Sequence, residues 1–182
     1  MILNMASTLK NKGEVQWENI SVHTMMLPMA DGVKLQTVIC LPQDAESCPV
    51  LLCRTPYADM QNYFTQMGEL YAHRGYGFVF QFARGTNQSE GVWEPYVNER
   101  SDGIDTLNWL QSQNWCESIG IHGVSYMAFT GWIIADALLA KAKGMYWVVN
   151  TFSDSLLPAF YLLQQYISFS SYTTSFLLSL NP

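Results

Sequence analysis

The segment Gly120-Ile121-His122-Gly123-Val124-Ser125-Tyr126-Met127-Ala128 decides the fold of this chain. Its apolar first half predicts a short strand that ends at Gly123. Ser125 follows in a tight turn, and a helix is expected to begin immediately after it. In a nucleophile elbow, such a strand-to-helix turn holds a serine in a strained conformation that pushes its hydroxyl out of the sheet. Gly123 and Ala128 are small enough for strand and helix to approach closely.

The generic elbow motif is only half matched, because it would place glycine where Met127 stands. A serine in a strand-to-helix turn is at least as often a helix N-cap as a nucleophile. The helix N-terminus would in either case direct amides and partial positive charge toward a developing oxyanion. This segment alone therefore leaves both interpretations of Ser125 open.

Strands and helices alternate on both sides of the turn. Apolar runs predict strands at 49–57, 76–83, 118–123 and 145–152, and helical spacing predicts helices at 61–74, 98–111 and 129–143. A further pair of strands, 16–29 and 33–41, would form a hairpin at Asp31-Gly32 and lie at one edge. Such alternation predicts an α/β fold, a mostly parallel sheet with helices on both faces.

Composition excludes several classes of function. The chain has 182 residues, enough for one domain, and its net charge of -6 argues against a nucleic-acid surface, which needs clustered cations. Its four cysteines have no CxxC or Cys/His spacing, so no zinc site is expected, and a reaction at a nucleophilic serine implies no metal or organic cofactor. The chain has no evident signal peptide and no run of about 20 apolar residues. We therefore predict a cytoplasmic protein that binds no membrane.

Five ordered segments make the chain similar to a known family. They are ADGVKLQT, PVLLCRTPYAD, RGYGFVFQFARGTNQSEG, NERSDGIDTLNWLQSQNWC and GVSYMAFTGW. Together they resemble the cocaine esterase/X-prolyl dipeptidyl peptidase family of α/β hydrolases. The resemblance implies that Ser125 is the acyl-forming nucleophile, and that the Tyr57 hydroxyl and the Tyr126 backbone N–H stabilise the oxyanion. Tyr57 would follow a buried strand at the carboxyl edge of the sheet, where ligands of open α/β sheets bind.

Other polar residues have simpler interpretations. We interpret Glu90, Glu94 and Glu99 as a solvated face, and Asp102 as a complement to a helix dipole. His122 lies in the strand before the turn and is expected to be a core residue or a neighbour of the site.

The chain departs from the family after Ser125. No histidine follows that serine, although a serine needs a histidine base oriented by an acid. Phe82 and Ala128 stand where the resemblance implies aspartate and glycine. We expect residues 1–155 to form the hydrolase core and 156–182 to begin a helical cap, in which the chain is truncated. It is then a fragment of a longer hydrolase, a shortened relative that no longer catalyses, or a protein that receives its histidine from another chain.

The sequence therefore predicts a serine hydrolase that cleaves an acyl ester or amide through an acyl-serine intermediate. Its partners would be small-molecule esters, amides or short peptides, and assembly into a homo-oligomer stays open. The first alternative is a catalytically silent module that acts in binding or assembly. The second is a small-molecule-binding protein with a pocket formed by its aromatic C-terminal segment.

Overall fold

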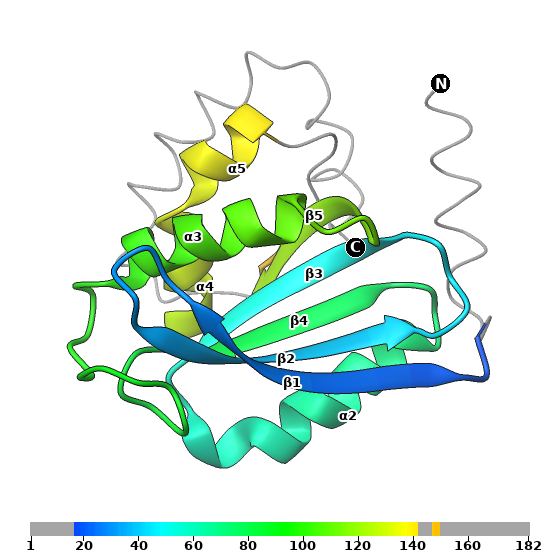
Figure 1. Cartoon of the computed structure of the whole chain (residues 1–182), viewed down its shortest axis with the longest axis horizontal. Coiled ribbons are helices and arrows are strands. Elements are labelled where there is room, and N and C mark those ends of the chain that lie inside the picture. The colour runs from blue at the N-terminus through cyan, green and yellow to red at the C-terminus, as the bar shows by residue number, and fades with distance from the viewer. Residues whose placement is uncertain (1–16, 142–146, 150–182) are drawn as a thin grey trace, which may run out of the picture. The chain divides into compact units, whose positions relative to one another are not determined.

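The computed structural model describes residues 17–141 and 147–149 (Figure 1). Their elements are β1 (Ile20–Pro28), β2 (Lys34–Pro42), β3 (Cys48–Thr55), the 3-10 helix η1 (Ala58–Met60), α2 (Gln61–Ala72), β4 (Gly77–Phe82), α3 (Glu99–Gln111), β5 (Cys116–Gly123), α4 (Tyr126–Trp132), α5 (Ala135–Lys141) and β6 (Trp147–Val149). The predicted boundary at 155/156 and the predicted cap lie outside the described residues.

The strands form one mixed sheet in the order β1-β2-β4-β3-β5-β6. β4, β3, β5 and β6 pair with one another in parallel, whereas β2 pairs antiparallel with both β4 and the edge strand β1. This arrangement confirms the mostly parallel α/β sheet with an antiparallel pair at one edge.

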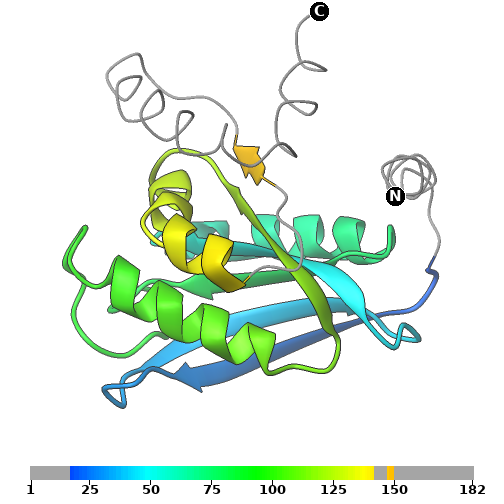
Figure 2. The ribbon, with the colours of Figure 1, turned by 90° about the horizontal axis from the view of Figure 1, so that it is seen from above.

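Side chains alternate between two apolar clusters because successive residues of a strand point to opposite faces. One face carries Val50, Leu52, Val79, Ile119 and Ile121, which pack with Leu107, Leu110, Ile134 and Leu138. The other face carries Leu51, Cys53, Phe78, Phe80 and Phe82, which pack with Phe64 and Ala72. β3 is therefore buried on both faces, as its continuous apolar run predicts. Figure 2 shows α2 on one side of the sheet and α3 and α5 on the other.

The first hairpin forms where it is predicted. β1 and β2 pair from Ile20↔Pro42 to Pro28↔Lys34. The Met29 N–H donates to the Val33 carbonyl, which leaves a loop of Ala30, Asp31 and Gly32. This loop lies between the two predicted strands, 16–29 and 33–41. Of the two turn residues Asp31 and Gly32, only Gly32 has a positive φ, at 88°.

The segment after Ser125 contains two helices where a single helix at 129–143 is predicted. α4 begins at Tyr126, directly after Ser125 as the turn predicts, and ends at Trp132 before α5 begins at Ala135. Gly131 lies where an added Cβ would be 2.3 Å from the Ile121 Cγ2 atom, so α4 rests closely on β5. None of the helices within 17–141 is long and apolar enough to cross a membrane.

Candidate active site

Ser125 stands at the sharp bend between β5 and α4. Its backbone has φ 57° and ψ −127°, a region that residues other than glycine rarely enter. Strain of this kind costs about 1–3 kcal/mol and is found where surrounding packing imposes it, often at functional sites. The Ser125 side chain is exposed. The strand–serine–helix arrangement predicted from residues 120–128 is therefore present.

Ser125 occupies the N-cap position of α4, but its side chain makes no capping hydrogen bond. Its carbonyl oxygen instead accepts hydrogen bonds from the backbone N–H groups of Ala128 and Phe129, at 3.1 and 3.3 Å. Within the described residues the hydroxyl is not used by the helix.

Gly123 allows this bend because nothing larger fits there. An added Cβ would lie 2.6 Å from the carbonyl carbon and oxygen of Met127 and 2.9 Å from the backbone nitrogen of Ala128. These are backbone atoms of α4, so the end of β5 and the helix meet with no room for a side chain.

We expect Gly123→Ala to lower the free energy of unfolding by about 1–3 kcal/mol, because α4 must move away from β5. Urea denaturation measures the change. Gly32→Ala is the comparison, since nothing lies within 4 Å of its added Cβ and only its φ of 88° opposes the substitution. A Gly123→Ala protein as stable as the wild type would contradict the close approach.

Tyr57 follows β3, the strand that pairs with β5 in parallel. Its backbone N–H donates to the Thr55 Oγ1 atom at 3.1 Å, and its half-buried ring packs against the cluster that contains Cys53 and Met127. Tyr57 and Ser125 thus follow the carboxyl ends of neighbouring parallel strands. Among the described residues no hydrogen bond joins their side chains, and the Tyr57 hydroxyl has no partner there.

Tyr126 is the first residue of α4, so its backbone N–H has no acceptor within the helix. Its side chain lies in a polar and aromatic environment. The hydroxyl donates a short hydrogen bond to the Glu99 Oε1 atom and accepts one from the Tyr96 backbone N–H at 2.9 Å. Partial burial, together with the Glu99 hydrogen bond, raises the pKa of the Tyr126 hydroxyl above its usual value.

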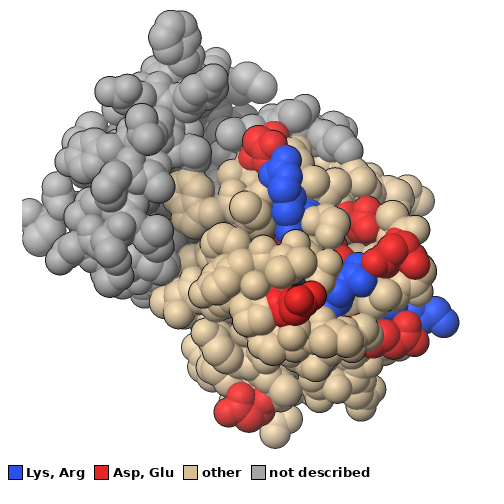
Figure 3. Space-filling model, turned by 90° about the vertical axis from the view of Figure 1, so that its left-hand side faces the viewer, with Lys and Arg blue, Asp and Glu red and all other residues tan. Residues whose placement is uncertain are grey.

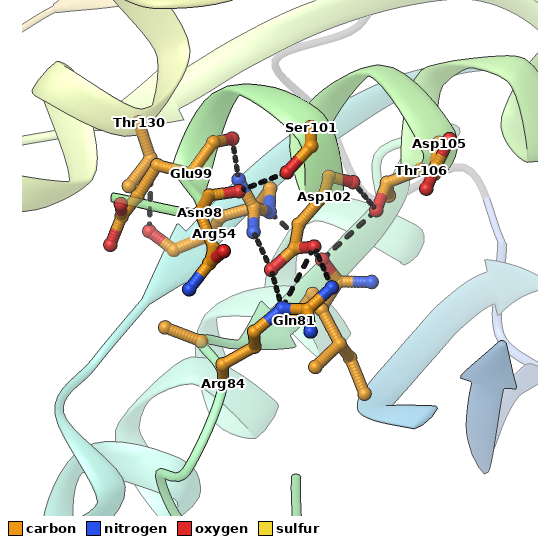
Figure 4. Close-up of polar contacts among 12 residues, drawn as sticks. Arg54, Gln81, Arg84, Asn98, Glu99, Ser101, Asp102, Asp105, Thr106 and Thr130 are labelled. Carbon is orange, nitrogen blue, oxygen red and sulfur yellow. Dashed lines mark hydrogen bonds and ion pairs between the residues drawn. The ribbon is translucent and has the colours of Figure 1, made fainter. Parts of the chain in front are cut away.

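A buried network of charges lies beside these residues (Figure 4). Arg84 binds Asp102 through two nitrogens, at 2.9 Å from Nε to Oδ2 and 2.7 Å from Nη2 to Oδ1. Arg54, whose side chain is 2% exposed, donates to the Gln81 Oε1 atom at 2.8 Å and to the Glu99 carbonyl oxygen at 2.6 Å. Arg54 also lies 3.8 Å from the Asp102 carboxylate. Burial lowers the pKa of Arg54, and the charges of Asp102 and Glu99 oppose that shift.

Two carboxylates differ from their interpretation in the sequence. Glu99 is not part of a solvated face, because it is only 3% exposed. Asp102 does lie in the first turn of α3, but it is buried and pairs with two arginines. The sequence signal for these contacts was the pair of acidic residues in the first turn of the predicted helix, together with the Arg84-Gly85 pair earlier in the chain. Their burial depends on the 84–98 loop, whose path no periodicity predicts.

None of the three described histidines is hydrogen-bonded to Ser125. His122 lies in β5, where its Nδ1 atom is 3.4 Å from the Tyr71 hydroxyl and its ring packs against Tyr71 and Phe78. Burial lowers the pKa of His122. His73 Nδ1 lies 2.6 Å from the Trp17 carbonyl oxygen, and His23 lies in β1. His122 thus packs in the core, one of the two positions expected for it.

No group of three metal-ligating side chains converges within residues 17–141 and 147–149. None of the four cysteines forms a disulfide bond, and burial raises the pKa of Cys53 to about 12. On the face drawn in Figure 3, acidic and basic side chains are interspersed among neutral ones.

Comparisons with known proteins agree with this geometry. Residues 31–153 match the family described as X-Pro dipeptidyl-peptidase (S15 family). Cocaine esterase from Rhodococcus sp. (strain MB1 Bresler) is 39% identical over 126 residues, which are 66% of this chain and 22% of that protein. The chain thus spans about a fifth of the length of this curated relative.

Two solved structures share the fold. An α-amino acid ester hydrolase is 29% identical, with a TM-score of 0.52 over 66% of this chain and 24% of its own. A serine hydrolase without a lid from Xanthomonas campestris is 20% identical, with a TM-score of 0.55 over 71% of this chain and 70% of its own. The predicted α/β-hydrolase fold and the predicted family are both confirmed, and the chain belongs to the X-Pro dipeptidyl-peptidase (S15) family of α/β hydrolases.

Proposed function

We propose that this chain carries the nucleophile and oxyanion site of a serine hydrolase that cleaves an acyl ester or amide. The observation that carries the proposal is the backbone of Ser125, held at φ 57° between β5 and α4 with an exposed, uncapped side chain. A strained backbone at an exposed serine does not stabilise the fold. A nucleophilic serine, in contrast, needs this backbone conformation so that its hydroxyl can reach a substrate carbonyl.

The proposed reaction is acyl transfer in two steps. A general base takes the Ser125 proton as the oxygen attacks the carbonyl carbon, and the resulting oxyanion accepts hydrogen bonds from the Tyr57 hydroxyl and the Tyr126 N–H. The tetrahedral intermediate then releases an alcohol or amine that takes up the proton, leaving an ester on Ser125. Water hydrolyses that ester by the same route and restores the serine.

The substrate class follows from relatives. The family is described as X-Pro dipeptidyl-peptidase, and the curated relative is named as an esterase. We therefore propose small-molecule esters, amides or short peptides as substrates. We assign no base within this chain, because His23, His73 and His122 all precede Ser125 in sequence and none of them is hydrogen-bonded to Ser125.

The test uses the longest natural product that contains this sequence. Hydrolysis of a p-nitrophenyl ester and of an X-Pro p-nitroanilide is measured before and after titration with a fluorophosphonate. We expect hydrolysis of at least one substrate, and its complete loss at one equivalent of bound probe per chain. Hydrolysis that survives full phosphonylation would contradict a serine mechanism.

A second function is favoured by one observation: none of the three described histidines is hydrogen-bonded to Ser125. The scaffold could then serve in binding or assembly without catalysis. If the longest product shows no hydrolysis and no phosphonylation, this result would support the second function and overturn the first.

Tyr57→Phe provides a finer test of the oxyanion site. Removal of one oxyanion donor typically costs about 2.7–4 kcal/mol of transition-state stabilisation, so we expect kcat to fall about 10²- to 10³-fold. KM should change much less, because the hydroxyl would act on the oxyanion and not on the ground state. Steady-state kinetics on the ester measures both constants. An unchanged kcat would remove Tyr57 from the mechanism.

A further inference from the structure

We propose that Glu99 and Tyr96 are positioning residues for the oxyanion site, acting through the side chain of Tyr126. This inference rests on the proposed function, in which the Tyr126 N–H binds the oxyanion. The inference gives a role to Glu99, the buried carboxylate at the start of α3, beyond the packing of the sheet and helices.

The hydroxyl of Tyr126 is held from two directions. Glu99, the first residue of α3, accepts its proton, and the Tyr96 backbone N–H donates to its oxygen at 2.9 Å. Tyr96 has a φ of 70°, which a residue other than glycine rarely adopts. Two residues with strained backbones, Ser125 and Tyr96, are thus joined to Tyr126, the first by a peptide bond and the second by a hydrogen bond.

The ring of Tyr126 is also enclosed by aromatic side chains. Ring centroids of Trp93, Tyr96 and Phe129 lie 5.4, 5.0 and 5.7 Å from its own. Tyr96 in turn packs edge-on against Phe129 at 4.9 Å. Contacts on several sides together with two hydrogen bonds leave the ring a single position.

Stability alone does not account for Glu99. Its Oε2 atom is buried and has no hydrogen-bond partner within the described residues. A buried polar atom without a partner costs free energy, and for a charged group the cost is larger. The nearby positive charge of Arg54 offsets part of this cost, although the hydrogen bond from Arg54 goes to the backbone carbonyl oxygen of Glu99 and not to its carboxylate. Within the described residues, the bond from Tyr126 is the one hydrogen bond that the carboxylate itself makes.

Fixing the Tyr126 side chain also fixes the peptide before it. Tyr126 begins α4 and directly follows the strained Ser125, so the peptide that joins them could relax if the ring moved. That peptide carries the N–H proposed to bind the oxyanion. A donor acts on a transition state only when it is already aimed at the position that the oxyanion will occupy. Glu99 and Tyr96 would hold the Tyr126 N–H in that orientation.

The test measures the second-order rate of fluorophosphonate labelling in the longest natural product, together with kcat and KM for the ester. The variants are Tyr126→Phe, Glu99→Ala and Glu99→Gln, and the matched control is Tyr71→Phe, whose hydroxyl lies at His122 on the opposite face of the sheet. Hydrogen bonds to charged groups predict that Tyr126→Phe and Glu99→Ala slow labelling and kcat roughly 10- to 100-fold, with KM nearly unchanged. Glu99→Gln keeps an acceptor oxygen and should restore much of the rate.

Each outcome decides between the two proposals. No labelling of the wild-type protein overturns the proposed function and this inference together. Labelling of the wild type with an unchanged rate in Tyr126→Phe overturns this inference alone. A loss of thermal stability at wild-type labelling rate would also overturn it, because it would leave Glu99 and Tyr126 with a structural role only. If Glu99→Ala does not fold, Tyr126→Phe carries the test, since that variant keeps the enclosed ring.

Discussion

Replacement of Asp102 by asparagine is expected to lower the free energy of unfolding by about 3–5 kcal/mol. The side chain of Asp102 is 2% exposed and pairs with Arg84 at 2.7 Å, while Arg54 lies 3.8 Å away. Without the carboxylate, the two guanidinium groups lose the counter-charge that lies between them, and Arg84 keeps its ion pair with the exposed Asp31 at 2.7 Å. The amide of an asparagine would also direct donors toward donors. Urea denaturation at neutral pH measures the loss.

Asp136→Asn is the matched control. Asp136 binds Arg100 through both oxygens at 2.9 and 2.8 Å, so its geometry resembles the Arg84–Asp102 pair. The side chains of Arg100 and Asp136 are 48% and 68% exposed, and water screens exposed pairs. We therefore expect little change in stability. Equal losses in the two variants would contradict the claim that burial makes the Asp102 network important.

Ser125→Ala is expected to abolish hydrolysis, with a fall in kcat of about 10⁴- to 10⁶-fold as in other enzymes that lose a nucleophilic serine. The fold should persist, because the Ser125 hydroxyl makes no capping bond and the side chain is exposed. Ester hydrolysis by purified variants measures the effect, and circular dichroism checks the fold.

Ser112→Ala provides the control for removing a hydroxyl elsewhere. Ser112 is exposed at the end of α3, where its hydroxyl donates to the Trp109 carbonyl oxygen at 2.7 Å. Its kcat should equal that of the wild type. A Ser125→Ala protein that retains most of its activity would show that another group forms the acyl intermediate.

Local patterns predicted the fold well because each central element is long and strongly periodic. β3 and β4 are continuous apolar runs, and Gly75, which ends the segment predicted as a helix at 61–74, has a φ of 79° just after α2. The Ser125 turn could be recognised because its geometry demands small residues at fixed places. Gly123 meets that demand through direct contact with the backbone of α4.

The sequence could not predict features that depend on distant contacts. Glu99 is buried because it meets Tyr126, 27 residues later, and Asp102 because it meets Arg84. Tyr126 and Arg84 both lie outside α3, so the periodicity of that helix gives no information about these contacts. The break between α4 and α5 lies within a uniformly apolar stretch, so hydrophobic periodicity gave no sign of it.

The central claim is that the oxygen at Ser125 forms the covalent intermediate. Phosphonylation of the longest natural product, followed by proteolysis and mass spectrometry of the labelled peptide, tests it most directly. The account predicts one adduct per chain, located on Ser125 and lost in Ser125→Ala. An adduct on any other residue of a catalytically active product, or activity without an adduct, would contradict it.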